Sequence, residues 1–329
     1  MSNNTAETKA QSQAQAKPQA SAQPATAGRV SVCVCTYRRP DQLALLLDTL
    51  AAQSRVPDQV IVVDNDGDQS ALPVCQARDD AFDLIYDHEP EQNISLARNR
   101  TLSYAEGEWI GFLDDDEIAP ADWLQLMLQT AKKHKADGVL APVISEVPGD
   151  APRWIRKGDF FGRERYATGT VVPANQLRIG NALIKHSCIR SKDAPFDPDF
   201  GLSGGEDGRL LSSLAAQGAR FVWCDEAVVT EPVEPKRLRL SWILMRALRG
   251  GQDYGLHYLS GAYGPVGSRQ RGWFAIKAVA ILLMCAPLAL LSGLLGRHRA
   301  VHWLKKAYAQ MGKILAFSSY RYQEYKADS

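Results

Sequence analysis

The chain has 329 residues, 45% hydrophobic and 23% charged, which is enough to bury one large core or two modest ones. Its six cysteines show neither zinc-site spacing nor a paired framework, which excludes a disulfide-rich scaffold and favours buried thiols in a reducing compartment. The net charge of +1 conceals an asymmetry, because residues 1–235 carry 23 Lys and Arg against 34 Asp and Glu, whereas residues 236–329 carry 15 against three.

Residues 1–28 consist mainly of Ala, Gln, Ser, Thr and Pro and show no apolar period. Such a segment cannot bury a core, so we expect a disordered N-terminal tail. It also lacks the apolar run of a secretory signal peptide, and we expect none here.

From residue 29 onward, short apolar runs alternate with segments of helical period. Five runs predict strands, at residues 29–36 (RVSVCVCT), 59–66 (QVIVVDND), 83–87 (DLIYD), 109–116 (WIGFLDDD) and 138–144 (GVLAPVI). Three segments predict helices, at residues 40–53, 94–105 and 120–135, and Pro40 suits the first helical position. Strands that alternate with helices over this length predict an α/β layered fold with a mostly parallel sheet.

Acidic residues stand where two of these strands end. Asp64 lies at the end of the second apolar run, and the fourth run is followed by Asp114, Asp115, Asp116 and Glu117. Ligands of parallel sheets bind beyond the carboxyl ends of the strands, so these acids are expected at the binding edge. Two such carboxylates can bind Mg²⁺ or Mn²⁺ together with diphosphate oxygens, and a chance acidic run on the surface is the alternative. No glycine-rich phosphate loop follows the first strand.

A second acidic site follows the glycines of FGLSGGEDGRLLSSLAAQG, residues 200–218. Glu206 and Asp207 open a segment with leucines at helical spacing. Acids in the first turn of a helix are favoured by the helix dipole, which is a purely structural interpretation. A glycine loop that presents paired acids also suits a general base facing a substrate hydroxyl. The local sequence leaves both interpretations open.

Five blocks in order, VSVCVCTYRRP, VIVVDND, NISLARNRTLSYAEGEWIGFLDDDE, RIGNALIKHS and GGEDGRL, resemble the inverting family-two glycosyltransferases of GT-A fold. The resemblance covers about residues 29–235 and is strongest to bacterial enzymes that build exopolysaccharide on a lipid carrier, the succinoglycan type included. It implies a nucleotide-diphosphate-sugar donor, with UDP the family's commonest nucleotide, a divalent cation (Mn²⁺ or Mg²⁺) and a lipid-linked saccharide acceptor.

Residue roles follow from the resemblance position by position. It implies that Thr36, Tyr37 and Arg38 border the base and ribose, that Asp64 accepts hydrogen bonds from the base, and that Arg98 lies near the donor. For the diphosphate and its metal, it implies Asp114 and Asp116, the two ends of the Asp-x-Asp motif, with Asp116 as the direct metal ligand and Asp115 between them at the donor. It also implies Glu231 as a further metal ligand. Glu231 stands in VTEPV, where the family often has a His.

The resemblance also implies that Asp207 is the catalytic base, with Glu206 as the alternative acid of the pair. The base takes the proton of the acceptor hydroxyl as it attacks the anomeric carbon, and a single displacement inverts the configuration. Glycoside hydrolases also use two carboxylates, but they need a protonated acid at the leaving oxygen and have no use for a metal-binding strand end. Transfer is therefore the preferred reaction.

The C-terminal region combines basic and apolar residues. Residues 237–255 predict a basic amphipathic helix, which is typical of a membrane surface or a partner groove. Residues 278–296 carry no charge over 19 positions, close to the length that spans a bilayer. Pro287 interrupts this run, so a single span, a re-entrant segment and a buried core helix stay open. His298 and His302 are spaced to share a metal, but we expect solvated interface residues.

We therefore expect three parts: a tail (1–28), a GT-A domain (29–235) and a basic, membrane-associated helical region (236–329) with its apolar segment near 278–296. Expected partners are the nucleotide-sugar donor, a lipid-linked saccharide acceptor and membrane lipids, at the cytoplasmic face of the inner membrane. The alternative is a membrane-anchored, catalytically inactive nucleotide-sugar-binding or scaffold protein. Nucleic acid is not an expected partner, because the basic residues alternate with long aliphatic runs. The oligomeric state is open.

Overall fold

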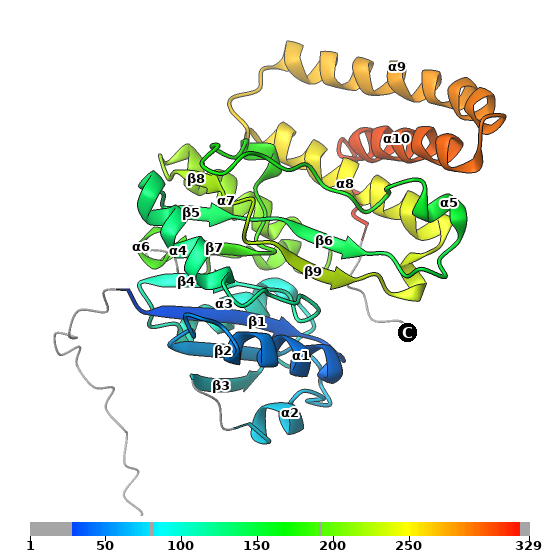
Figure 1. Ribbon diagram of the computed structural model, residues 1–329. Coiled ribbons are helices and arrows are strands. Elements are labelled where there is room, and N and C mark those ends of the chain that lie inside the picture. The colour runs from blue at the N-terminus through cyan, green and yellow to red at the C-terminus, as the bar shows by residue number, and fades with distance from the viewer. Residues whose placement is uncertain (1–27, 79–81, 191–192, 323–329) are drawn as a thin grey trace, which may run out of the picture.

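The computed structural model of the protein describes residues 28–78, 82–190 and 193–322 (Figure 1). The expected disordered tail lies outside the described residues, apart from Gly28. The elements in chain order are β1 (Val30–Thr36), α1 (Pro40–Ala51), β2 (Gln59–Asp64), α2 (Leu72–Gln76), β3 (Asp83–His88), α3 (Ile94–Tyr104), β4 (Trp109–Phe112), α4 (Trp123–His134), β5 (Gly138–Leu140), β6 (Val143–Glu146), α5 (Arg153–Arg156), η1 (Ala174–Gln176), β7 (Ala182–Lys185), α6 (His186–Ile189), η2 (Pro198–Phe200), α7 (Glu206–Ala216), β8 (Phe221–Trp223), β9 (Val229–Pro232), η3 (Pro235–Arg237), α8 (Leu240–Ser260), α9 (Ser268–Gly293) and α10 (Arg297–Leu315).

Seven strands form the central sheet in the order β3-β2-β1-β4-β7-β5-β8, and β6 pairs with β9 in a small second sheet. Strands β1 to β4 run parallel, β7 runs antiparallel to β4 and β5, and β8 is parallel to β5. The chain passes from β1 outward to β2 and β3 and then returns to the other side of β1 as β4. The loops after β1 and β4 therefore diverge, and such a switch point is where α/β sheets bind ligands. The mostly parallel α/β sheet predicted from the sequence is confirmed.

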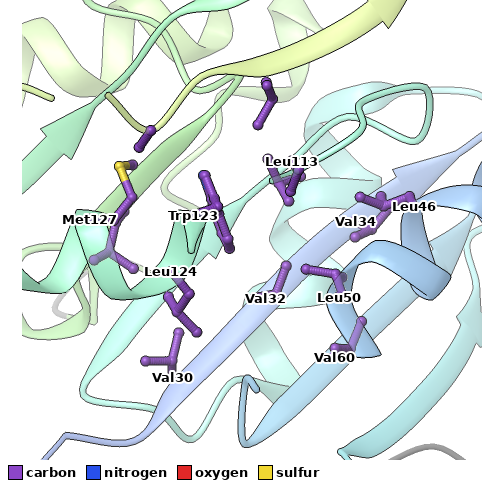
Figure 2. Packing of buried hydrophobic residues seen from close by; sticks show 14 of the residues in the cluster. Val30, Val32, Val34, Leu46, Leu50, Val60, Leu113, Trp123, Leu124 and Met127 are labelled. Atoms are coloured by element: carbon purple, nitrogen blue, oxygen red, sulfur yellow. The ribbon is translucent and has the colours of Figure 1, made fainter. Parts of the chain in front are cut away.

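Helices cover both faces of the sheet, and strand β1 shows how the sequence produces this arrangement. Its valines point to one face and Cys33 to the other, as the two-residue period of a strand requires. The valines pack against the leucines of α1 and against Trp123 of α4 (Figure 2). The opposite face packs against α3 and α7, through Ala97 and Leu211 among others. Because both faces are buried, the parallel strands are apolar throughout.

Two expected boundaries differ in the structure. Residues 138–144, expected as one strand, form β5 and β6 in two different sheets. Pro142 lies between them and has no N–H for a strand ladder, so the chain leaves the central sheet there. Strand β4 ends at Phe112, which places the following acids on a loop and not in the strand. Strands β7, β8 and β9 have only three or four residues each, too few to show an alternating pattern.

The C-terminal helices form a layer in which α10 lies between α8 and α9 (Figure 1). Ile243 of α8 is buried in one cluster with Phe160 of the α/β domain and Val301 of α10. Gly312 lets α10 approach α8 closely, because a Cβ there would lie 1.9 Å from the carbonyl oxygen of Leu248. Helix α8 is thus packed on the α/β domain. All six cysteines are free, as expected.

Among the described residues, α9 is the one helix long and apolar enough to cross a membrane by length and composition. Only 17% of its most apolar stretch is buried. A core helix would be mostly buried, so the core-helix interpretation of residues 278–296 is disfavoured. Pro287 lies inside α9 without ending it.

Candidate active site

Asp115 ties the loop after β4 to the end of β1. Its buried carboxylate accepts hydrogen bonds from Thr36 Oγ1 at 2.9 Å and from Arg39 Nη1 at 2.9 Å. Thr36 is the last residue of β1, and Arg39 immediately precedes α1. The two loops that diverge at the switch point are therefore held together by one carboxylate. Asp115 and Thr36, both expected near the donor, lie where these two loops meet.

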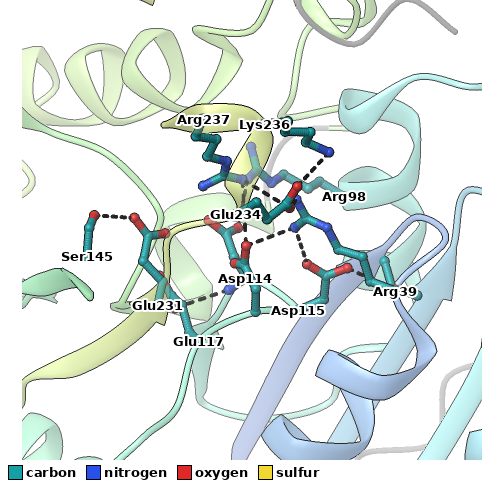
Figure 3. A network of polar contacts seen from close by, with 12 residues as sticks. Arg39, Arg98, Asp114, Asp115, Glu117, Ser145, Glu231, Glu234, Lys236 and Arg237 are labelled. Atoms are coloured by element: carbon teal, nitrogen blue, oxygen red, sulfur yellow. Dashed lines mark hydrogen bonds and ion pairs between the residues drawn. The ribbon is translucent and has the colours of Figure 1, made fainter. Parts of the chain in front are cut away.

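Asp116 and Asp114, the other two acids of the loop, have different environments. Figure 3 shows Asp114 in the network of charged side chains that surrounds this loop. Asp116 is buried, and its Oδ2 lies 3.0 Å from Arg39 Nη1 and 3.7 Å from Arg237 Nη2. Burial and the charge of Asp114 raise the pKa of Asp116 to about 7, although Arg39 opposes the shift. The side chain of Asp114 is 49% exposed, so this carboxylate is open to a ligand.

Glu117 and Glu231 add two buried carboxylates next to this loop. Glu117 accepts a hydrogen bond from the Asp114 N–H at 3.1 Å, and its Oε1 has no hydrogen-bond partner among the described residues. Burial and Asp114 raise the pKa of Glu117 well above its ordinary value. Glu231 accepts a hydrogen bond from Ser145 Oγ at 2.6 Å. Negative charge therefore exceeds the available positive charge at this edge of the sheet.

The residues present fit a divalent cation. Carboxylate oxygens are the ligands that Mg²⁺ and Mn²⁺ prefer, and a cation would offset the burial and the neighbouring negative charge that raise the pKa values of Asp116 and Glu117. Within the described ranges, no three or more His, Cys, Asp or Glu side chains are gathered tightly enough to hold a metal by themselves. Diphosphate oxygens would have to complete the coordination. His302, one of the two histidines whose spacing suggested a metal, lies on α10 and packs against the ring of Phe160, with 5.0 Å between ring centroids.

The first turn of α7 places Asp207 opposite the segment before β7. Gly204 and Gly205 have φ values of 77° and 94°, which L side chains rarely adopt, and they turn the chain into the helix. The Asp207 carboxylate accepts hydrogen bonds from the N–H groups of Ile179 at 3.2 Å and Gly208 at 2.7 Å. Burial raises the pKa of Asp207, but the charge of a neighbouring arginine and these N–H groups outweigh burial and lower it. Asp207 is therefore ionised. Its side chain is half-buried.

Arg98 on α3 is the arginine that lowers the pKa of Asp207. It lies between the acidic loop after β4 and the acids at the start of α7. Its guanidinium pairs with Glu206, and its Nη2 lies 3.5 Å from Asp114 Oδ1. The guanidinium carbon is 5.8 Å from the centroid of the Phe196 ring. Glu206 is 3% exposed, and burial raises its pKa to about 7 in spite of Arg98. Glu206 is thus committed to Arg98, whereas Asp207 is the acid of the pair that a ligand can reach.

The other residues expected at the donor lie at the ends of β1 and β2. Arg38 has a left-handed φ of 55°, donates to Asp66 Oδ1 at 3.0 Å, and lies 5.2 Å from the centroid of the Tyr37 ring. Asp64 is fully buried. Its carboxylate fixes the loop after β2 by accepting three hydrogen bonds, from the N–H of Asp66 at 3.0 Å, the N–H of Ala71 at 2.8 Å and the hydroxyl of Tyr86 at 3.3 Å. A direct hydrogen bond from a nucleobase to Asp64 would require this loop to open, because the carboxylate is fully buried.

Helix α8 contributes a wall of the site that the sequence pattern did not indicate. Arg249 Nε donates to the Ser203 carbonyl at 2.9 Å, and a Cβ at Gly205 would lie 2.0 Å from Asp253 Oδ1. His257 is buried one turn further along α8, with its Nε2 3.7 Å from Asp253 Oδ1. The sequence signal for this contact was the spacing of Arg249, Asp253 and His257, which are four residues apart and therefore lie on one face of the helix.

Comparison with known proteins agrees with this geometry. The family described as "Glycosyl transferase family 2" matches residues 31–185. The succinoglycan biosynthesis protein ExoM of Rhizobium meliloti (strain 1021) is 36% identical over 271 residues, which is 80% of this chain and 84% of that protein. The galactofuranosyltransferase GlfT1 of Mycobacterium tuberculosis (strain ATCC 25618 / H37Rv) is 33% identical over 225 residues, 62% of this chain and 70% of that protein.

A solved structure supports the fold assignment. The mannosyltransferase PcManGT from Pyrobaculum calidifontis, in complex with GDP-Man and Mn²⁺, superposes with a TM-score of 0.61. The superposition covers 90% of this chain and 89% of that one at 19% identity, so it bears on the fold alone. Together with the extent of the identity to ExoM, these findings show that the chain belongs to glycosyl transferase family 2 and is a glycosyltransferase of GT-A fold.

Proposed function

We propose that the protein transfers a sugar, with inversion, from a nucleoside-diphosphate donor to a lipid-linked saccharide in the synthesis of an exopolysaccharide. The observation that carries this proposal is the position of Asp207. This carboxylate is ionised and half-buried, and Arg98, which pairs with the adjacent Glu206, lies 3.5 Å from Asp114 of the acidic loop. The similarity to a succinoglycan biosynthesis protein supports the product class.

We place the donor between the ends of β1 and β4, in a position that we call the donor crevice. In this proposal Tyr37 and Arg38, which pack together, lie on one side of the donor and Asp114, which is near Arg98, on the other. The hydrogen bond between Thr36 and Asp115 would lie beneath the donor. Arg98 and Asp114 would lie at the diphosphate and sugar. We place the nucleobase of the donor in contact with the loop after β2, which Asp64 holds in place. UDP is the first nucleotide to test because it is the commonest in the family.

Asp116 and Asp114 would hold a divalent cation, with Glu231 as the further candidate ligand. When bound, Mn²⁺ or Mg²⁺ supplies positive charge to the leaving diphosphate. The protein's own residues prepare this position, because Arg39 and Arg237 compensate only part of the charge around Asp116.

Asp207 is the proposed general base. As the acceptor oxygen forms its bond to the anomeric carbon, its proton moves to the Asp207 carboxylate, and the bond from that carbon to the diphosphate oxygen breaks on the opposite face. Hydrogen bonds from Ile179 and Gly208 orient the carboxylate. Glu206 positions Arg98 and does not take the proton.

We also propose that α9 attaches the enzyme to the cytoplasmic face of the inner membrane. Large apolar side chains of α9 are exposed, including Leu283 at 71% and Leu290 at 78%. Basic residues of the following helix, among them Arg299 and Lys306, would interact with anionic headgroups. A lipid-linked acceptor would then be presented close to the crevice.

The test is a calorimetric panel of UDP, GDP and their sugars, with and without Mn²⁺, followed by an assay of transfer to a membrane-lipid extract. We expect one nucleotide to bind in a Mn²⁺-dependent way, and a nucleotide at 100 times its Kd to stabilise the fold by about 2.7 kcal/mol. Absence of nucleotide binding would refute the proposed enzyme. Binding without transfer to any lipid-linked acceptor would support the inactive, membrane-anchored alternative.

A further inference from the structure

A cavity of about 410 Å³ lies outside the proposed donor position, and Arg178, one residue before Ile179, is part of its lining. Strand β6, the segment after α5 and the segment before β7 line it. It is on the β7, β5 and β8 side of β4, whereas the donor crevice opens between β4 and β1. A volume of this size accommodates a small-molecule group.

The lining of the cavity is rich in arginine. Two acids, Asp159 and Glu164, stand against four arginines, which are Arg156, Arg163, Arg165 and Arg178. Arg165 is already paired, with its Nε 2.9 Å from Asp225 Oδ1. Arg163 and Arg178 have no ion pair of this kind among the described residues.

Arg178 is the half-buried arginine of this lining. No ion pair or side-chain hydrogen bond joins it to another described residue. Burial and the nearby Arg163 lower the pKa of Arg178 to about 10, although the negative charges of Asp207 and Glu117 oppose the shift. A guanidinium withdrawn from water and placed beside a second guanidinium is costly unless an anion binds there.

One segment connects the cavity to the proposed base. Arg178 lines the cavity and directly precedes Ile179, whose N–H donates to Asp207 Oδ2 at 3.2 Å. At the next position, a Cβ on Gly180 would lie 3.4 Å from Glu117 Oε1. Ser145 also lines the cavity and donates to Glu231. The charge of Asp207 acts on Arg178, so the cavity lies within electrostatic range of the proposed base.

The outer wall of the cavity is held by the C-terminal helices. Ile155 and Phe160 line it and are buried in one cluster with Ile243 of α8 and Val301 of α10. Lys305 Nζ donates to the Phe160 carbonyl at 2.8 Å. The cavity thus lies between the proposed base and the helical layer that would meet the membrane, which is where a lipid-linked acceptor would enter.

We propose that this cavity is the acceptor site and that Arg178, assisted by Arg163, binds an anionic group of the acceptor, either a carboxylate of an acidic sugar or a phosphate. This inference rests on the proposed function and adds the chemical class of the acceptor. Carboxylate and phosphate share the oxygen geometry that a guanidinium binds through two parallel hydrogen bonds. A neutral acceptor would bring no negative charge to Arg178 and Arg163.

The test is calorimetry on the full-length protein in detergent, with UDP and Mn²⁺ at saturation so that the donor position is filled. Glucuronate, glucose 6-phosphate and glucose are the probes for a carboxylate, a phosphate and a neutral sugar. We expect one of the two anions to bind at least about tenfold more tightly than glucose, and its identity distinguishes the two sources. We expect Arg178→Gln to abolish this preference and Arg178→Lys to keep part of it.

Arg220→Gln, an exposed arginine outside the cavity, is the matched control and should keep the preference. Arg163→Gln, at the exposed rim, should weaken it by a smaller factor and serves if Arg178→Gln melts early. Equal binding of all three probes to wild type, or an unchanged preference in folded Arg178→Gln, would overturn the acceptor inference while UDP binding stays intact. Failure of wild type to bind any nucleotide would overturn the proposed function and this inference together.

Discussion

Arg98 and Glu206 form a buried ion pair that joins helix α3 to the first turn of helix α7. The pair occupies one of the two adjacent acids at the start of α7 and leaves the other, Asp207, accessible. The same guanidinium lies 3.5 Å from Asp114, so one side chain sets the relative positions of the proposed base and the acidic loop. Adjacent acids that look equivalent in the sequence therefore have different roles in the fold.

The first prediction separates these two acids by substitution. Asp207→Asn should lower kcat by about 100-fold or more and leave donor affinity within a factor of about two, because the amide keeps the shape but cannot accept the proton. Single-turnover transfer and UDP calorimetry measure the two quantities. Asp199→Asn, at an exposed acid of η2, is the matched control and should behave as wild type.

Glu206→Gln should reduce kcat less than Asp207→Asn does. If the order of the two variants is reversed in single-turnover assays, Glu206 is the base and the ion pair with Arg98 must open during the reaction.

The second prediction concerns the pH dependence of stability. The pKa of Glu206 is raised to about 7 in the folded protein and returns to its ordinary value on unfolding, so the folded state binds more protons between about pH 4.5 and 7. The free energy of unfolding should therefore rise as pH falls through this window, by on the order of 3 kcal/mol at most from this group. Urea unfolding of wild type and Glu206→Gln at pH 5, 6, 7 and 8 isolates its contribution. Parallel curves for the two proteins would contradict the raised pKa.

The third prediction tests the cation. Asp116→Ala should remove the Mn²⁺-dependent part of UDP affinity, by about tenfold or more, because it removes a ligand of the proposed metal. The apo protein should stay folded, since the raised pKa shows that the Asp116 charge is unfavourable where it lies. Calorimetry with and without Mn²⁺ gives the first quantity and thermal unfolding the second. Asp122→Ala, an exposed acid at the start of α4, is the control. Mn²⁺ dependence that survives Asp116→Ala would refute the metal assignment.

The sequence predicted the strands and helix ends that depend only on neighbouring residues. Residues 30–36 and 59–64 are β-branched and buried on both faces, so their apolar runs are unmistakable, and Pro40 begins α1 as expected. Strand-end acids in a parallel sheet also converge by geometry alone. Residues 138–144 were expected as one strand because an apolar run does not reveal that Pro142 sends the chain into a second sheet.

The remaining parts of the site depend on long-range pairing. Nothing local to Arg39 shows that it binds Asp115, 76 positions away, and nothing local to Asp64 shows that its oxygens are used by its own loop. Helix α8 has the composition of a membrane-surface helix, yet Ile243 is buried against the α/β domain. Amphipathic periodicity identifies an apolar face but not whether protein or lipid covers it.

The packing of α8 also determines how the membrane proposal has to be tested. Removing residues 234–329 would strip Arg249 from the glycine loop and Ile243 from the core, so loss of activity in such a truncation would be ambiguous. Single substitutions on the exposed face of α9 avoid this problem.

The last prediction is that Leu290→Glu and Leu283→Glu each weaken membrane binding by about tenfold or more without changing UDP affinity. These leucines are 78% and 71% exposed, and their separation of seven residues places them on one face of α9. Insertion of a leucine side chain into an apolar phase contributes about 1.5–3 kcal/mol, and a glutamate there reverses the sign. Flotation with anionic liposomes measures binding. Leu45→Glu, at a leucine of α1 that is 55% exposed, adds the same charge at the end of the molecule opposite α9 and is the control (Figure 1). If α9 inserts, transfer to a lipid-linked acceptor should fall in the two α9 variants much more than transfer to a soluble acceptor analogue. Equal flotation of the α9 variants, the control and wild type would show that lipid does not cover this face.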